Sequence, residues 1–142
     1  MLDLQTVSDR LEIDDLLTSY TVAVDTGDWD RLDHVFVADA WIDYTASGGI
    51  AGPFPEVKAW LAETLPVFTS MQHYVAQREV RLDGDRAEVR AYLLNPLVID
   101  RADGSRWQKL IGGVYVHDLV RTGAGWRSRK LVEELRWDLG TA

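Results

Sequence analysis

The sequence predicts an α+β fold in which a strongly curved antiparallel sheet wraps around N-terminal helices. Apolar residues recur at helical spacing in three segments before Ser70. After Ser70 the chain changes to strand-like segments of roughly ten residues, separated by three turns that contain Gly, "LDGDR", "RADGSR" and "RTGAGW". Helices followed by an antiparallel meander are typical of the α+β class. A length of 142 residues with 46% hydrophobic side chains suits a single domain, which we assign to residues 1–142.

The first helix is expected over residues 6–26. Thr6 or Ser8 could cap its start, and Gly27 is a typical stop, so the helix should end near Asp25. Its apolar stripe consists of Ile13, Leu16, Leu17, Tyr20 and Val24.

Two shorter helices and one strand follow. Residues 28–36, "DWDRLDHVF", form a short helix with an aspartate at its start, and residues 37–46 form a strand. Residues 47–55, "SGGIAGPFP", form a loop. The third helix covers residues 55–68 and is cut short by Pro66, because proline disrupts a helix interior.

Residues 69–77, "TSMQHYVAQ", read as a strand with a histidine at its centre. Alternation places Met71, His73 and Val75 on one face and Gln72, Tyr74 and Ala76 on the other. His73 therefore lies on a mostly apolar row. A buried imidazole needs a hydrogen-bond partner, so His73 is either a core residue bound to a carbonyl or hydroxyl or part of a functional site.

The strand over residues 86–99 repeats this pattern with an amide. Asn95 is the one polar member of a row that otherwise consists of Ala87, Val89, Ala91, Leu93, Leu97 and Ile99. Pro96 follows it and marks a bulge or an edge, because proline cannot donate to a β-ladder. Asn95 either satisfies backbone groups at that irregularity or points into a site.

Composition excludes several functions. A net charge of −8 and a pI near 4.7 argue against nucleic-acid and anionic-membrane partners. The chain has no cysteine, so thiolate nucleophiles and Cys-type metal sites are excluded. Neither a signal peptide nor a run of about 18 apolar residues is present, and we expect a cytoplasmic protein.

Five blocks of sequence resemble a known family. "AVDTGDWDRL", "WIDYTAS", "MQHYV", "LIGGVYVHDLVRTGAGW" and "ELRW", between Ile13 and Trp137, resemble the SnoaL-like branch of the nuclear-transport-factor-2-like superfamily. Within this branch the chain resembles scytalone dehydratase, bile-acid 7α-dehydratase and hexachlorocyclohexane dehydrochlorinase. The resemblance implies a cone-shaped α+β barrel with a deep apolar pocket and elimination chemistry by an Asp-His dyad.

Matching the family pattern onto this chain implies that the dyad is Asp25 and His73. Removal of a proton next to a leaving group needs a base with a pKa near neutrality, and imidazole provides one. An aspartate on the other ring nitrogen fixes the tautomer and stabilises the imidazolium. Tyr20 and Tyr44 match positions at which the dehydratases place tyrosines, so they could bind a substrate carbonyl or a leaving hydroxyl.

The same resemblance implies the remaining substrate-binding residues. Asn95 stands where the bile-acid enzyme carries an acid, and Arg136 matches a late arginine that would bind a substrate oxygen or carboxylate at the pocket mouth. A second pocket histidine of scytalone dehydratase has no counterpart here. Apolar side chains expected in the pocket indicate a hydrophobic, cyclic or polyketide-like substrate: Leu17, Trp41, Trp60, Leu93 and Leu97.

We therefore predict a cofactor-independent lyase that carries out dehydratase-type β-elimination. The same pocket could instead serve a polyketide cyclase or an isomerase, or a non-catalytic module that only binds a ligand, because one fold hosts many functions. Catalysis requires the His73 ring and the Asp25 carboxylate within about 2.6–3.2 Å of each other, with room beside the second ring nitrogen.

The other histidines are not assigned to the site. His34 lies among charges and should be solvated, and His117 in "GVYVHDLV" is interpreted as a surface or interface residue. No His, Asp and Glu cluster has ligand spacing, so we expect no metal. Exposed apolar residues on the outer face of the sheet, such as Val114 and Val116, would suit a homodimer or homotrimer.

Overall fold

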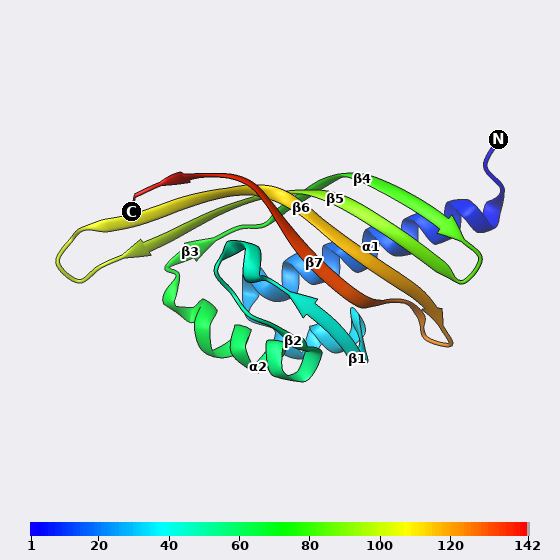
Figure 1. Cartoon of the computed structure of the whole chain (residues 1–142), viewed down its shortest axis with the longest axis horizontal. Helices are drawn as coiled ribbons and strands as arrows, with labels where there is room; N and C mark the ends of the chain where they lie inside the picture. Colours follow the sequence, from blue (N-terminus) through cyan, green and yellow to red (C-terminus); the bar gives the residue numbers. More distant parts are fainter. Residues whose placement is uncertain (142) are drawn as a thin grey trace.

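The computed structural model describes residues 1–141 and has the predicted α+β architecture. Helix α1 (Leu4–Thr26) runs along a curved seven-stranded sheet, and the shorter helix α2 (Phe54–Thr64) lies against the edge of the sheet formed by residues 36–53 (Figure 1). Within residues 1–141, none of the helices is long and apolar enough to cross a membrane.

Helix α1 begins earlier than the sequence predicts. Its N-cap is Asp3, whose carboxylate accepts a hydrogen bond of 2.7 Å from the backbone N–H of Thr6. The expectation that Thr6 or Ser8 caps the helix is therefore wrong, because an aspartate three residues upstream takes that role. The helix ends as predicted at Gly27, which adopts the left-handed conformation with φ of 70°.

Short elements connect α1 to the main sheet. Pro66 lies in the 3-10 turn directly after α2, as expected for a residue that ends a helix. The predicted loop over residues 47–55 contains a short strand and the start of α2. In chain order these elements are η1 (Trp29–His34), β1 (Phe36–Asp43), η2 (Thr45–Ser47), β2 (Ala51–Pro53), α2 (Phe54–Thr64) and η3 (Leu65–Val67).

The second half of the chain forms a meander of long strands. The three predicted turns all separate strands: β3 (Ser70–Met71), β4 (Tyr74–Asp83), β5 (Arg86–Asp100), β6 (Arg106–Thr122) and β7 (Gly125–Gly140). The strand order is β2-β1-β7-β6-β5-β3, with β4 also paired to β5. The pair β1–β7 is parallel, so the sheet is mixed and not purely antiparallel as predicted. Strand pairing in residues 1–141 follows an open path, and the expected barrel is not closed by hydrogen bonds.

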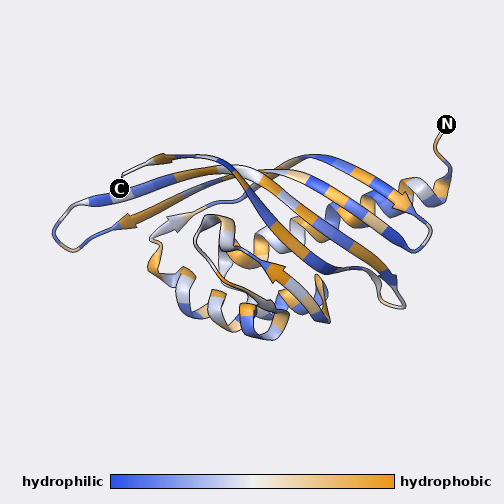
Figure 2. Cartoon of the chain, in the orientation of Figure 1, coloured by the Kyte–Doolittle hydropathy of each residue, from blue (hydrophilic) through white to orange (hydrophobic). Residues whose placement is uncertain are grey.

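Register shifts curve this sheet. They occur in β4 between Ala76 and Glu79, and between β6 and β7 at Gly112/Gly113 and Asp118/Leu119. Such bulges bend a strand and increase its twist. Alternating hydropathy along β5 and β6 (Figure 2) turns the apolar rows toward α1, where they form the core.

A buried ion pair ties α1 to the β6–β7 hairpin. The Arg121 guanidinium donates hydrogen bonds of 2.7 and 2.9 Å to the two carboxylate oxygens of Asp9. The indole N–H of Trp126 adds a bond of 3.2 Å to Asp9, and Arg121 lies 4.6 Å from the Trp126 ring centroid. Asp9 is 4% exposed, so this carboxylate is matched to partners inside the core.

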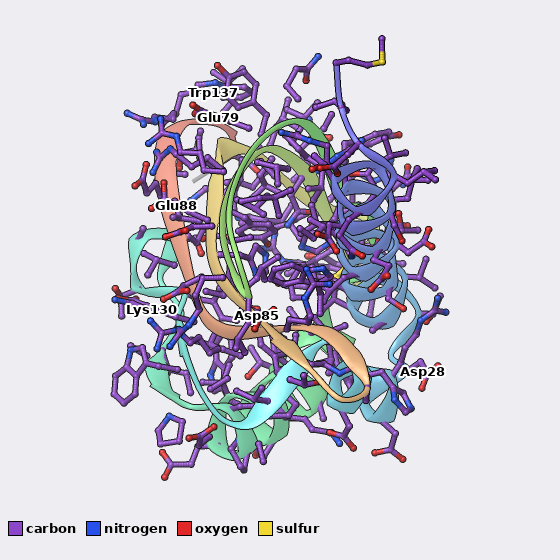
Figure 3. All side chains as sticks on the ribbon, turned by 90° about the vertical axis from the view of Figure 1, so that its right-hand side faces the viewer. Asp28, Glu79, Asp85, Glu88, Lys130 and Trp137 are labelled. Atoms are coloured by element: carbon purple, nitrogen blue, oxygen red, sulfur yellow. The ribbon has the colours of Figure 1, made fainter. Side chains whose placement is uncertain are left out.

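The outer face of the sheet differs in part from the expectation. Val114 is buried within the chain and Val116 is partly buried, whereas Tyr92 and Trp137 expose large apolar areas. Glu88 and Lys130 point away from α1 on this side of the sheet (Figure 3). Assembly into a dimer or trimer stays a prediction.

Candidate active site

The candidate site forms where the predicted strand over residues 69–77 is interrupted. Strand β3 ends at Met71 and β4 begins at Tyr74, so His73 belongs to neither. Opposite the gap stands Pro96 in β5, whose carbonyl accepts a hydrogen bond of 3.2 Å from the Gln72 N–H. The His73 backbone N–H therefore has no partner in the ladder, and it donates to Asp25 Oδ2 instead, at 2.9 Å.

Asp25 binds His73 twice. Besides accepting from the backbone, its Oδ1 lies 2.6 Å from His73 Nδ1. The imidazole side chain is 7% exposed, and the Asp25 side chain is 20% exposed at the end of α1. A carboxylate only accepts hydrogen bonds, so Nδ1 carries a proton and Nε2 of a neutral ring carries the lone pair. The dyad geometry thus presents Nε2 as a base.

Asn95 meets the other side of the ring. Its Nδ2 lies 3.0 Å from His73 Nε2, which matches an amide donor facing an unprotonated nitrogen. Asn95 is 7% exposed, and its Oδ1 has no hydrogen-bond partner among the described residues. The His73 bond is therefore the main polar contact of this amide.

A cavity of about 200 Å³ opens beside Nε2. It lies between the sheet, the two helices and the loop after β1. Its polar lining includes His73, Asn95, Tyr20 and Tyr44. Its apolar lining comes mainly from Val24, Trp60, Leu61, Leu65, Phe68, Leu97 and Ile111. The cavity is mostly hydrophobic with a few convergent polar groups, as is typical of small-molecule sites.

Three tyrosine hydroxyls meet in this cavity. Tyr20 and Tyr44 hydroxyl oxygens lie 2.6 Å apart, and Tyr20 donates a longer bond of 3.5 Å to Tyr115. Burial raises the pKa of Tyr20, Tyr44 and Tyr115 well above the ordinary value. All three therefore stay protonated at neutral pH and can act as donors toward a substrate oxygen.

Glu133 also lines the cavity, and the sequence analysis missed it. It is 6% exposed and stands directly across from Tyr115 in the β6–β7 register. Burial raises the pKa of this carboxyl, while Ser47, the charge of His73 and Tyr115 act in the opposite direction. The signal was available, because Glu133 is the one acid in the inward row Leu131, Glu133, Leu135.

Other predicted site residues lie elsewhere. Leu17 and Leu93 are buried in the core without lining the cavity, whereas Trp60 and Leu97 do line it. Trp41 is 47% exposed, because the neighbouring Ala40 and Ile42 occupy the inward positions of β1. Leu17, Leu93 and Trp41 therefore belong to the core and the surface of the domain, not to the walls of the site.

Arg136 does not reach the pocket mouth. Its side chain is 60% exposed and donates a hydrogen bond of 3.1 Å to Glu134 Oε2. The register pairs Gly113 with Leu135 and Gly112 with Trp137, so Arg136 is the extra residue of a β-bulge. The expectation that Arg136 orients substrate is corrected by this placement on the outer face.

His117 is a core residue, which corrects its interpretation as a surface or interface histidine. It is fully buried, and burial lowers its pKa to about 3. Ser128 donates its hydroxyl hydrogen to the Lys130 carbonyl at 3.0 Å, so His117 Nδ1, 2.9 Å from Ser128 Oγ, must be the donor of that bond. His34, in contrast, is exposed as predicted.

The site offers no obvious set of metal ligands. Within residues 1–141, the His, Asp and Glu side chains form no group of three that could hold a metal ion. What the arrangement can do is proton transfer: an oriented imidazole, a buried carboxyl and several hydroxyl donors surround one apolar space.

The chain resembles known proteins in its sequence. A family model for the SnoaL-like domain matches residues 5–132. An uncharacterized protein of Mycobacterium tuberculosis H37Rv, Rv2910c, is 45% identical over 134 residues, covering 94% of this chain and 89% of that protein.

Two solved structures share the fold. Hexachlorocyclohexane dehydrochlorinase LinA-type3 from Novosphingobium barchaimii LL02 has a TM-score of 0.81 at 22% identity, covering 99% of this chain and 95% of the other. A scytalone dehydratase-like protein from Novosphingobium aromaticivorans DSM 12444 has a TM-score of 0.82 at 17% identity, covering 96% and 89%. These likenesses establish a shared nuclear-transport-factor-2-like fold whose relatives include lyases.

Proposed function

Because the chain belongs to the SnoaL-like domain family, we propose that it is a small-molecule lyase that carries out β-elimination on a cyclic carbonyl compound. The observation that carries this proposal is the Asp25–His73 contact of 2.6 Å beside an apolar cavity. This distance is within hydrogen-bond reach for an oriented base.

His73 is the base of the proposed reaction. Its Nε2 removes the proton next to the carbonyl group, and Asp25 stabilises the imidazolium that forms. The tyrosine hydroxyls donate to the carbonyl oxygen as negative charge develops on it, which lowers the barrier most in a site with little water. Tyr20 on α1 and Tyr44 directly after β1 provide these donors, and their hydroxyl oxygens lie 2.6 Å apart.

In the structure, the Asn95 amide faces the lone pair of His73 Nε2 that would remove the proton. The substrate must take over this position, and a rotation of the Asn95 amide is sufficient to release Nε2. That rotation costs little, because the Asn95 Oδ1 has no partner to lose within residues 1–141. The amide then lies beside the reacting atoms and can bind a substrate oxygen.

The size of the cavity favours a small substrate. A volume of about 200 Å³ is close to the cavity of about 150 Å³ that accommodates a benzene ring in another protein. A single six-membered ring fits such a space, whereas an extended polyketide or a steroid does not. A polyketide cyclase is therefore the weaker alternative.

The test uses 3-hydroxycyclohexanone, whose dehydration gives the conjugated cyclohexenone and a rise in ultraviolet absorbance. We expect turnover by the wild type, loss of turnover in His73→Ala, and unchanged kcat/KM in the matched variant His34→Ala, because His34 is exposed in η1. Equal rates in His73→Ala and the wild type would overturn the proposal. Binding of the ketone without any enone would indicate a ligand-binding module.

An isomerase is the second candidate, because the hydroxyl cluster would stabilise an enolate in that reaction as well. An isomerase returns the proton to another carbon without losing a group. Incorporation of deuterium from heavy water into a cyclic enone, without release of water from 3-hydroxycyclohexanone, would favour it.

A further inference from the structure

Glu133 is a buried carboxyl for which the proposed base chemistry has no use. It lies on β7 with 6% exposure, and its Oε1 lacks a hydrogen-bond partner in the described part of the chain. Its neighbour Glu134 forms ion pairs on the outer face, with Arg90 at 2.7 Å and with Arg136 at 3.1 Å. Among the ion pairs of residues 1–141, none includes Glu133.

Burial without a cation shifts the equilibrium of such a group toward its protonated form. An ionised carboxylate without a cation is strongly destabilised when it leaves water, as is any unpaired buried charge. Protonation removes most of that cost, and burial accordingly raises the pKa of Glu133. A neutral carboxyl carries an O–H donor, which Glu133 can direct into the cavity it lines.

We propose that Glu133 is the acid that protonates the leaving group, and that the substrate class is therefore β-hydroxy carbonyl compounds and not β-halo compounds. This inference rests on the proposed elimination at the same site. His73 and Glu133 line one cavity, and they come from the β3–β4 gap and from β7. The two groups thus provide a base and an acid for one small molecule.

The proposed elimination conserves atoms and charge. His73 Nε2 takes the proton from the carbon next to the carbonyl group, and the electrons of that C–H bond form the new C=C bond. The C–O bond to the leaving hydroxyl breaks, and its oxygen takes the proton of Glu133 to leave as water. His73 then holds one extra proton and Glu133 lacks one, and exchange with solvent restores both.

The need for an acid separates the two substrate classes. Hydroxide is a poor leaving group, so its departure depends on proton transfer, and a positioned acid contributes roughly 10²–10⁴-fold. Chloride is stable as an anion and leaves without a proton. A buried acid is therefore useful only for loss of water.

The test compares Glu133→Gln with the wild type on 3-hydroxycyclohexanone and 3-chlorocyclohexanone. Gln keeps the shape and a donor but cannot transfer a proton. We expect kcat/KM to fall at least about 100-fold on the hydroxy ketone and to stay within a few fold on the chloro ketone. Glu134→Gln is the matched control and should retain both activities, since Glu134 faces away from the cavity.

The outcomes separate the two proposals. Equal losses on both ketones, or no loss on either, would overturn the role of Glu133 while sensitivity to His73→Ala upholds the elimination. If the wild type forms no enone from both the hydroxy ketone and the chloro ketone, the elimination is overturned, and the role of Glu133 with it. Infrared spectra provide a readout without turnover: a protonated carboxyl band at neutral pH that disappears in Glu133→Gln supports the inference, and an ionised Glu133 refutes it.

Discussion

Substitution of Asp25 by Asn tests the dyad most directly, because the structure defines what the carboxylate does. His73 presents two donors to it, the backbone N–H at 2.9 Å and Nδ1–H at 2.6 Å. Aspartate accepts both hydrogen bonds through its two oxygens, whereas asparagine has one acceptor oxygen and one NH₂ donor group. The backbone N–H cannot change, so the oxygen of Asn must serve it. The NH₂ group then faces Nδ1, which becomes the acceptor.

This exchange inverts the imidazole. With Nδ1 unprotonated, the proton moves to Nε2, and no lone pair faces the cavity. We expect kcat/KM for dehydration to fall on the order of 10⁴-fold, the loss that a wrong tautomer causes in a serine hydrolase triad. Stability should fall by about 1–2.5 kcal/mol. A charge-assisted bond of roughly 1.5–3 kcal/mol is lost, and removal of a negative charge from a helix C-terminus returns about 0.5 kcal/mol.

The tautomer can be observed independently of turnover. Nitrogen-15 NMR of the His73 ring should show Nδ1–H in the wild type and Nε2–H in Asp25→Asn. Asp28→Asn is the matched control: Asp28 is exposed just after α1, makes no side-chain cap bond and points to solvent (Figure 3). Retention of the Nδ1–H form together with wild-type turnover in Asp25→Asn would refute the reasoning.

Two further predictions concern stability. Asp9→Asn should lower the free energy of unfolding in urea by roughly 2 kcal/mol, because the buried charge-assisted bonds to Arg121 are weakened while Arg121 keeps its exposed partner Asp85; a change below about 1 kcal/mol would contradict this. The folded-state pKa of His117 is lowered to about 3 from 6.5, so its contribution is fully present above pH 6.5 and is lost as pH falls toward 3. The slope is roughly 1 kcal/mol per pH unit. Glu133, whose pKa is raised above 4.5, acts in the opposite sense, losing stability as pH rises. The His117 effect is therefore read as the difference between the wild type and His117→Phe, and identical pH slopes in the two would refute it.

Local signals were sufficient for the elements and for part of the site. Gly27 and the three Gly-containing turns fix where helix and strands end through backbone conformation alone. Period-two alternation placed His73 and Asn95 on the inward face, and their side chains do meet at 3.0 Å. These inferences succeeded because each depends on neighbours in sequence.

Features that depend on pairing between distant strands could not be predicted from the sequence. The bulge at Arg136 follows from how β7 registers against Gly112 and Gly113, which no local pattern reveals. His117 is paired by Ser128, a residue on the next strand. Glu133 could have been predicted, since alternation alone places it on the inward face. A charged residue with Glu and Lys neighbours is, however, more typical of a solvated surface.

Asp25 and Asn95 both contact His73, but only Asp25 is also required by the fold. Asp25 is needed by the fold, because the gap between β3 and β4 leaves the His73 N–H without a ladder partner. Asn95 satisfies no backbone group of the strand gap. Its amide contacts His73, and its Oδ1 is buried without a partner in residues 1–141. An apolar side chain of similar shape would remove the desolvation cost of the unsatisfied Oδ1, and this gain offsets the loss of the bond to His73. Asn95→Leu should therefore change the free energy of unfolding by no more than about 1 kcal/mol, while kcat/KM on 3-hydroxycyclohexanone falls at least about 10-fold. A loss of stability above about 2 kcal/mol with unchanged turnover would make Asn95 a structural amide of the strand irregularity, and its position beside His73 would carry no function.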